Sequence, residues 1–512
     1  MSNPTDISHG SAVSSNGPST TKRVIVISFL HLDLGIGGAE QLVLQLAHAS
    51  RALHDTTTTI AVELWTTRCD AHHCFASVRP PDGVLYPSLR VYGRWIPAEI
   101  AGRARALCST LRLWYLTWCW ILFRSNWFPW SSKEENNVEH IIVLDVLPTP
   151  LPLLQLMTNA HLLFYCHFPD QLLTRNKTTA SLLRNGYRQA LNALENRTMA
   201  YSDMVVVNSK FTRTVVQETF SSLQAMGTLP VLYPALDTTS LDAGQASDNN
   251  QENQYTSTTI KPIVSLNRYE RKKNLELLLQ AAHWIRQKHP HVQLPPIIIA
   301  GGYDVHNIEN VEYRGELAQV VKDYQLTDVV KFRQSISDAE RKHLLRTALC
   351  VVYTPSNEHF GIVPLEAMYC ETPVLAVNSG GPVESVVDGV TGYLRPPTAH
   401  DFGEALLSWI QHPSRAASMG AAGRAHVIQS FGFQPRLVEE WRALLQTTIE
   451  RGRARQESTG YRVSRALVYI VEALLMLVVL LTVTHGLRKA QILNEHASLL
   501  GGVRRAVQRE EL

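Results

Sequence analysis

The chain has 512 residues and a formal net charge of +3, so it is too long for one compact core and has no basic excess that would indicate nucleic-acid binding. Its seven cysteines are scattered and form no C-x-x-C pair, which favours a reducing compartment over a disulfide scaffold. Residues 1–22 are polar and lack the apolar stretch of a signal peptide, so we predict a disordered N-terminus.

Short apolar runs separated by longer intervals follow in the first half of the chain. Such spacing predicts a parallel sheet with helical crossovers, and therefore a Rossmann-like domain over residues 23–237. Two cysteines and two histidines fall within residues 69–74, but their spacing matches no common zinc motif, so we expect a polar loop and no metal site. The candidate strands are residues 24–30, 59–65, 141–144, 162–165 and 204–208.

A glycine-rich turn, residues 35–38, separates the first apolar run from a helical one at 39–48. Small residues such as Gly37 and Gly38 let a backbone approach a diphosphate at a helix N-terminus. The full dinucleotide-binding spacing is absent, so a simple tight turn is an equal alternative.

Residues 106–123 combine aromatic side chains and leucines with flanking arginines. This crowding is typical of a helix that lies in a membrane interface, and a buried core helix would rarely need so many tryptophans. We therefore predict a membrane-associated helix here, with a core helix as the alternative.

The second half of the chain repeats the alternating pattern after a polar linker at residues 238–260. A second Rossmann-like domain is predicted over residues 261–451, closed by a helical run at 435–451. The simplest fold is α/β, with two doubly wound domains facing one another across a cleft. Its candidate strands are residues 261–266, 296–300, 329–332, 349–353 and 373–377.

Residues 466–483 are almost wholly apolar and are flanked by basic residues. About twenty apolar residues span a bilayer, so this segment is predicted to be a C-terminal transmembrane helix, followed by a tail at 484–512. A hydrophobic helix of the soluble core is the alternative. The flanking charges lie at both ends and leave the orientation open.

The most informative motif places two carboxylates, Glu358 and Glu366, eight positions apart around a turn that contains Phe360 and Gly361. The motif follows an apolar strand, and ligand loops lie at the carboxyl ends of parallel strands. Glu358 is expected in the loop and Glu366 just inside the next helix, whose N-terminus favours negative charge. Carboxylates accept from hydroxyl groups, so the loop suits a nucleotide sugar.

Two cations and a histidine also follow candidate strands, as Glu358 does. Arg268 and Lys273 follow the first strand of the second domain, where they could clamp a diphosphate and neutralise a leaving group. His167 follows another apolar strand and could bond a sugar hydroxyl or the reacting phosphate, with a structural histidine as an equal alternative.

Four motifs in this order resemble those of family 4 glycosyltransferases with the GT-B fold, and most closely those of mannosyltransferases of asparagine-linked glycosylation. They are residues 31–40, 165–170, 267–274 and 358–366, and the resemblance covers about residues 24–451. It implies that Arg268 and Lys273 hold the donor diphosphate, that Glu358 contacts the mannose and that Glu366 contacts the ribose. It also implies that Gly37 and Gly38 approach the phosphates and that His167 lines the acceptor side.

The resemblance further implies a retaining enzyme that needs no metal or other cofactor. Its donor would be GDP-mannose, and its acceptor a dolichol-diphosphate-linked Man1GlcNAc2 to which α-1,3- and α-1,6-linked mannose are added. The enzyme would lie on the endoplasmic reticulum membrane, in contact with membrane lipid, with its catalytic domains facing the cytosol.

Two other readings stay open at this point. A related family 4 enzyme would use a UDP-sugar and a lipid acceptor such as phosphatidylinositol. A catalytically dead membrane scaffold would be expected to lack Glu358, Arg268 or Lys273, and all three are present. The sequence does not decide whether one site makes both linkages, or in which order.

Overall fold

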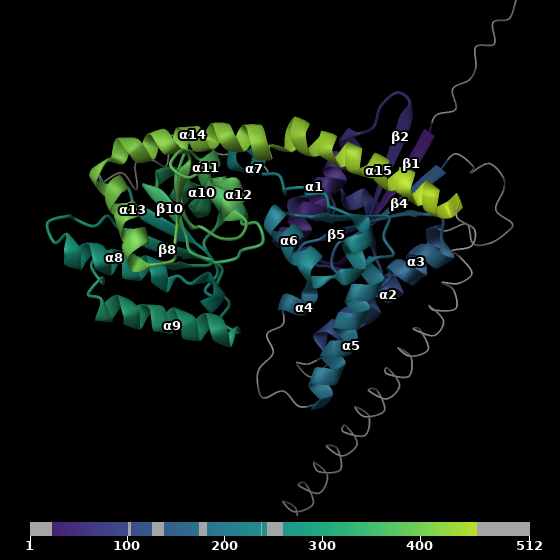
Figure 1. Cartoon of the computed structure of the whole chain (residues 1–512), viewed down its shortest axis with the longest axis horizontal. Helices are drawn as coiled ribbons and strands as arrows, with labels where there is room; N and C mark the ends of the chain where they lie inside the picture. The colour runs from purple at the N-terminus through teal and green to yellow at the C-terminus, as the bar shows by residue number, and fades with distance from the viewer. Residues whose placement is uncertain are drawn as a thin grey trace, which may run out of the picture.

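The computed structural model describes residues 23–100, 104–124, 138–173, 182–236, 238–242 and 260–457. These residues form two α/β domains that lie next to one another, with helices α14 and α15 running along both (Figure 1). Each domain is built on a six-stranded sheet in which all the pairings are parallel. The predicted fold class, two doubly wound domains of the GT-B type, is confirmed.

The first sheet has the strand order β3-β2-β1-β4-β5-β6, so the order reverses between β1 and β4. Its strands are β1 (Arg23–Leu34), β2 (Thr58–Cys69), β3 (Leu89–Val91), β4 (Val138–Leu144), β5 (His161–Cys166) and β6 (Met204–Val207). The helices of this domain are α1 (Gly38–Ala52), α2 (Arg105–Arg124), α3 (Leu151–Met157), α4 (Asp170–Leu173), α5 (Leu182–Met199) and α6 (Lys210–Thr219).

The second sheet has the order β12-β11-β10-β7-β8-β9, which is the same topology and reverses between β7 and β10. Its strands are β7 (Ile263–Leu266), β8 (Ile297–Gly301), β9 (Val330–Gln334), β10 (Cys350–Tyr353), β11 (Val374–Val377) and β12 (Gly392–Arg395). Its helices are α7 (Thr238–Asp242), α8 (Glu276–Lys288), α9 (Ile308–Asp323), α10 (Asp338–Thr347), α11 (Ile362–Tyr369), α12 (Pro382–Ser385), α13 (Ala399–Gln411) and α14 (Pro413–Phe431).

The strands are apolar because both faces of each sheet are buried. Ile27 and Phe29 of β1 pack in the core on one face, whereas Leu30 packs in the core on the other face. Period-two alternation sends neighbouring side chains to opposite faces, so a strand covered on both sides reads as a continuous apolar run. This is why the apolar runs located most of the strands.

Two edge strands, β3 and β12, were not predicted. Strand β12 begins at Gly392 and Tyr393 and, within the sheet, pairs with β11 alone. An edge strand is short and has one partner, so it needs no long apolar run. Its sequence, Gly-Tyr-Leu-Arg, therefore gave little signal.

The closing helix belongs to the first domain in space, not to the second. Helix α15 (Val438–Glu457) follows α14 but packs on α1, β5 and β6. Trp441 is fully buried there, and its indole nitrogen donates to Ser50 Oγ at 2.8 Å. The prediction that placed residues 435–451 with the second domain was therefore wrong about where this helix packs. The order of elements in the sequence does not reveal that the chain returns to the first domain.

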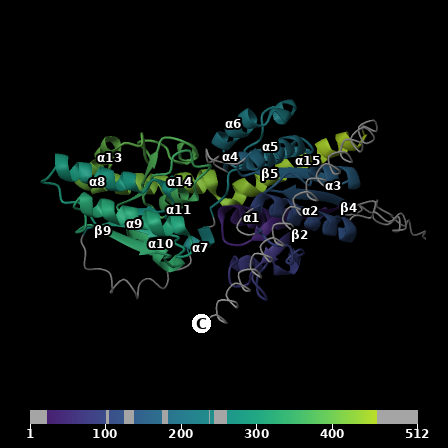
Figure 2. The same ribbon diagram turned by 90° about the horizontal axis from the view of Figure 1, so that it is seen from below.

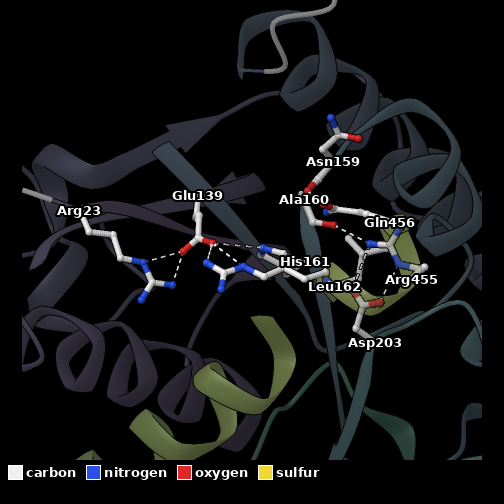
Figure 3. Close-up of polar contacts among 10 residues, drawn as sticks. Arg23, Glu139, Asn159, Ala160, His161, Leu162, Asp203, Arg455 and Gln456 are labelled. Atoms are coloured by element: carbon white, nitrogen blue, oxygen red, sulfur yellow. Dashed lines mark hydrogen bonds and ion pairs between the residues drawn. The ribbon is translucent and has the colours of Figure 1, made fainter. Parts of the chain in front are cut away.

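Polar contacts at the amino end of the first sheet hold the last turns of α15 (Figure 3). Arg455 Nε donates to Asp203 Oδ1 at 2.7 Å, and Arg455 Nη2 donates to the carbonyl oxygen of Ala160 at 3.0 Å. Arg453 and Arg23 both pair with Glu139. The chain thus crosses the domain boundary twice, and the last described helix is anchored to the first domain.

Helix α2 confirms a helix over residues 106–123 and packs one face on β1 and β2. Among the described residues it is the one helix long and apolar enough to cross a membrane, and 56% of its most apolar window is buried inside the protein. Trp118, Leu122 and Phe123 lie on the outer face and are 38%, 57% and 63% exposed. The buried face belongs to a core helix, and the association of the outer face with a membrane stays a prediction.

Three predicted segments lie outside the described residues: the N-terminus, most of the linker and everything after residue 457. The transmembrane helix predicted at 466–483 therefore stays a prediction.

Candidate active site

The topology places one switch point in each sheet. In an open parallel sheet, ligands bind outside the carboxyl ends of the strands, where the strand order reverses. These points lie after β1 and β4 in the first domain and after β7 and β10 in the second. The predicted motifs follow these strands or their neighbours in both domains, so the sheets themselves position the candidate site.

An aromatic stack joins the two sets of loops across the domain boundary. The rings of Phe168 and His359 are 3.7 Å apart at their centroids and nearly parallel, at 8°. Burial lowers the pKa of His359 to about 4, so the ring is neutral at physiological pH. Because Phe168 follows His167 and His359 follows Glu358, the stack brings the predicted acceptor residue and the predicted donor residue to the same junction.

Lys273 and Glu358 form the centre of the predicted donor side. Lys273 Nζ lies 2.5 Å from Glu358 Oε2, and both side chains are mostly but not fully buried. Burial opposes ionisation of Glu358, but the charge and hydrogen bond of Lys273 outweigh it and lower the pKa of this carboxyl. The protein thus presents a cation and a carboxylate side by side, which suits a phosphate next to a hydroxyl.

The Glu358 loop is shaped by backbone conformation. Gly361 caps α11 with φ at +81°, which favours glycine, and a Cβ atom there would approach Tyr353 to 3.1 Å. Phe360 is 5% exposed, and its side chain packs in the core of the second domain. Of the predicted residues in this turn, Phe360 therefore offers its backbone and not its ring to a ligand.

Glu366 lies inside α11, as expected, but the structure pairs it with a residue that the sequence did not indicate. It is 6% exposed and forms an ion pair with Arg341 of α10. Burial raises the pKa of Glu366, and the charge of Arg341 opposes this rise. Arg341 therefore favours the ionised carboxylate that a ribose hydroxyl would meet.

Arg268 lies in the predicted strand-to-helix loop, but it does not join the Lys273–Glu358 pair. Its side chain is 63% exposed, and its guanidinium is 3.9 Å from Glu270. A long, exposed cation next to the switch point can reach a diphosphate, so its predicted role stays a prediction.

A buried polar cluster lies at the switch point of the first sheet. His31 Nδ1 lies 2.8 Å from Asp145 Oδ2, and His31 Nε2 lies 3.0 Å from the carbonyl oxygen of Asp33. Both nitrogens face acceptors, which requires the doubly protonated ring. Burial opposes that charge, but Asp145 outweighs it and raises the pKa of His31 to about 9.

His167 joins this cluster. Its Nε2 lies 3.2 Å from Asp145 Oδ2, and its ring is 24% exposed. When Nε2 donates to the carboxylate, Nδ1 becomes the acceptor of the ring. The geometry thus suits a histidine that receives a proton or a hydrogen bond from a hydroxyl.

The glycine turn of the first domain begins α1. Gly37 is the N-cap of α1, and the side chain of Glu40 folds back close to it. A Cβ atom at Gly38 would meet no atom within 4 Å, so there is room for a ligand next to this helix N-terminus. The contact of both glycines with phosphate stays a prediction.

The chain is similar to known proteins over most of its length. A family model described as glycosyl transferases group 1 matches residues 247–426. The chain is 41% identical to the human α-1,3/1,6-mannosyltransferase ALG2 over 413 residues, which cover 79% of this chain and 92% of that protein. The ALG2 of Dictyostelium discoideum is 37% identical, over 80% of this chain and 95% of its own length.

The chain belongs to the ALG2 family of mannosyltransferases. It is therefore a glycosyltransferase with a nucleotide-sugar donor and a glycan acceptor. Solved structures agree on the fold. The sucrose-phosphate synthase of Thermosynechococcus elongatus superposes with a TM-score of 0.62 at 20% identity, over 84% of this chain and 100% of its own.

Three residues of the site were missed in the sequence: His31, Asp145 and Arg341. His31 opens the first predicted motif, so its motif was found although its role was not. Asp145 directly follows β4, and that position was a usable signal. Arg341 lies in the middle of a helix, and nothing in the local sequence connects it with Glu366.

Proposed function

We propose that this mannosyltransferase adds two mannoses, one through an α-1,3 and one through an α-1,6 bond, from GDP-mannose to a dolichol-diphosphate-linked Man1GlcNAc2 acceptor. The observation that carries the proposal is the Phe168–His359 stack, which brings the Lys273–Glu358 pair and His167 together. The names of the relatives support the two linkages, and the resemblance of the four motifs supports the donor and the acceptor.

On the donor side, Lys273 and Arg268 would bind the diphosphate and offset the charge that develops on GDP as it leaves. Glu358 would then be released from Lys273 to accept from mannose hydroxyls, and Glu366 would accept from the ribose. The backbone at Gly361 and the N-terminus of α11 would add N–H donors. Gly37 and Gly38 would bring the N-terminus of α1 towards the phosphates from the opposite side.

On the acceptor side, His167 would orient the attacking hydroxyl through Nδ1, while Asp145 holds its other nitrogen. The product would retain the anomeric configuration of the donor. Because the cations and helix termini can meet the leaving-group charge, we propose that the reaction needs no metal or cofactor.

We also propose that the enzyme works on the cytosolic face of the endoplasmic reticulum membrane. A dolichol-linked acceptor is buried in lipid, so the reaction has to take place at the membrane surface. The outer face of α2 exposes Leu122 and Phe123, and such side chains suit an interface between lipid and water. The predicted transmembrane segment at 466–483 would supply a second anchor.

The experiment is transfer of radiolabelled mannose from GDP-mannose to a synthetic lipid-linked Man1GlcNAc2 by purified protein in detergent, with chelator present. We expect products with one and then two added mannoses, whose linkages are read by α-mannosidase digestion. Turnover of a UDP-sugar in place of GDP-mannose would overturn the donor assignment. If chelator abolishes the activity and added divalent metal restores it, the proposed metal independence is wrong.

A further inference from the structure

The first turn of α6 is completed by a side chain from the other domain. The first N–H groups of a helix have no partners within it. The N-cap Ser209 accepts from Thr212 N, whereas the two preceding amides donate across the boundary. Lys210 N donates to Glu384 Oε2 at 2.8 Å, and Phe211 N donates to Glu384 Oε1 at 2.7 Å.

Glu384 lies in α12 of the second domain, and a third bond strengthens the same contact. Tyr233 Oη donates to Glu384 Oε2 at 2.8 Å. Burial, and then the hydrogen bond to Glu384, raise the pKa of Tyr233, so the phenol keeps its proton. A carboxylate at a helix N-terminus is further stabilised by the helix dipole. We call this set of contacts, Glu384 with Lys210, Phe211 and Tyr233, the α6 latch.

On the side of the first domain, the latch continues to the acceptor residue. Asn208 and Ser209 connect β6 with α6. Asn208 Nδ2 donates to the carbonyl oxygen of His167 at 3.0 Å, and Ser209 Oγ donates to the carbonyl oxygen of His359 at 2.6 Å. Two consecutive residues thus hold the backbone of His167 and that of the donor loop. In both views, α6 lies on the side of its domain that faces the second domain (Figures 1 and 2).

On the side of the second domain, the latch continues to Glu358. Gly381 N donates to the carbonyl oxygen of Glu358 at 2.7 Å. A Cβ atom at Gly381 would lie 2.2 Å from the carbonyl oxygen of Phe360, and one at Gly380 would lie 2.5 Å from that of Glu358. These contacts are too close for any side chain, so the segment before Glu384 packs directly against the backbone of the Glu358 loop.

We propose that Glu384 is a positioning residue for the transfer reaction. By capping α6 across the domain boundary, it fixes the separation between His167 and the Lys273–Glu358 pair, so that donor and acceptor meet in a reactive geometry. The proposal rests on the proposed function for the roles of these residues. A displacement of about 1 Å between reacting groups can cost on the order of 100-fold in rate, so a contact outside the chemistry can set kcat.

The first test measures transfer kinetics and GDP affinity in the full-length variants Glu384→Ala and Glu384→Gln. We expect kcat to fall about 100-fold in the alanine variant and about 10-fold in the glutamine variant, whose single carbonyl oxygen still accepts one bond. The Kd for GDP, measured by calorimetry, should stay within about twofold, because the donor residues remain in place. A kcat that stays at the wild-type level in both variants would overturn the proposal, and so would a Kd for GDP that rises as much as kcat falls.

A matched control is Asp328→Asn, which also converts a carboxylate of the second domain to its amide. Asp328 pairs with Arg286 and precedes β9, so it lies at the amino edge of the sheet, opposite the site. We expect wild-type kinetics for this variant.

A milder variant, Tyr233→Phe, removes one hydrogen bond of the latch and serves as the test if Glu384→Ala does not fold. We expect its kcat to fall about threefold. An unchanged kcat would count against the proposal.

The second test is hydrogen exchange followed by mass spectrometry, without any substrate. In Glu384→Ala, the amides of Lys210 and Phe211 should exchange faster. The amides of the peptide that contains residues 357–361 should also exchange faster. Faster exchange in α6 alone would overturn the coupling to the donor loop. This readout does not depend on the substrate, so a failure of the proposed mannose transfer remains distinguishable from a failure of the latch.

Discussion

At the switch point of the first sheet, His31 and Asp145 form an ion pair whose side chains are 4% and 3% exposed. At the switch point of the second sheet, Lys273 and Glu358 form one whose side chains are 14% and 23% exposed. The two sheets have the same strand order, so topology does not cause this difference. His31 lies within β1 and Asp145 directly follows β4, whereas Lys273 and Glu358 lie beyond the ends of their strands.

The difference in burial separates two tasks. A fully buried pair is held together because either charge alone would be costly in the interior, so it fixes geometry. A pair that water can reach exchanges its partners at much lower cost, so it can release a carboxylate and a cation to a substrate. We therefore interpret the first pair as a support for His167 and the second as the pair that acts on the donor.

The largest expected effect comes from removing the cation of the second pair. Lys273→Ala should lower transfer by on the order of 10³-fold, because a preorganised charge at the leaving group is lost. The thermal midpoint should change little, since the side chain lies at a ligand loop. Kinetics and thermal unfolding check both statements.

The neighbouring Lys272 offers the control. Its side chain is 71% exposed and pairs with Glu270, so Lys272→Ala should keep wild-type activity. Equal losses in the two variants would mean that the loop as a whole, and not Lys273, carries the effect.

Breaking the buried His31–Asp145 pair should lower the stability of the protein more than its rate of transfer. Asp145→Asn leaves the buried His31 without its counter-charge, and we expect a loss of about 3 kcal/mol in the free energy of unfolding. Denaturant unfolding measures it. A variant as stable as the wild type would show that the pair does not hold the first domain together.

The two pKa shifts of this pair determine how the stability of the protein changes with pH. The pKa of His31 is raised from 6.5 to about 9, so its stabilisation is fully present below pH 6.5 and is lost as the pH rises through about 9. The pKa of Asp145 is lowered from 3.8 to about 2, so its contribution is lost only in strong acid. The wild type should therefore lose stability between pH 6.5 and 9, and Asp145→Asn should not.

A smaller effect is expected at the ribose side of the second domain. Arg341→Ala leaves Glu366 buried without a partner, which raises its pKa further and weakens a carboxylate that accepts from hydroxyls. We expect the Kd for GDP to rise about 10-fold with little change in kcat. Calorimetry with GDP tests this, and an unchanged Kd would remove Glu366 from donor binding.

The smallest effect is expected on the outer surface of the first domain. Leu122→Ser combined with Phe123→Ser should reduce binding of the protein to anionic vesicles by a few-fold, because apolar area that could enter the interface is lost. The Kd for GDP should stay the same. Binding that matches the wild type in a vesicle flotation assay would assign the membrane contact to another segment.

The Glu358 loop was predictable because its residues are close in the chain. Glu358, Gly361 and Glu366 lie on one strand-loop-helix unit, so local rules for turns and helix starts were enough to position them. Arg341 could not be predicted with them, because its contact with Glu366 depends on how α10 packs against α11. In the same way, nothing near His31 in the sequence points to Asp145, which lies on another strand.

The sequence by itself determined the two parallel sheets, the loops that carry the predicted site residues and the family. These features follow from apolar periodicity and from short motifs, both of which depend on nearby residues. Only the tertiary structure decided that α15 returns to the first domain, that Glu384 caps α6 and that the buried His31 is charged. Each of these depends on groups that meet only after the chain has folded, since burial and partner distance, and not residue type, decide whether a charge or an amide is satisfied.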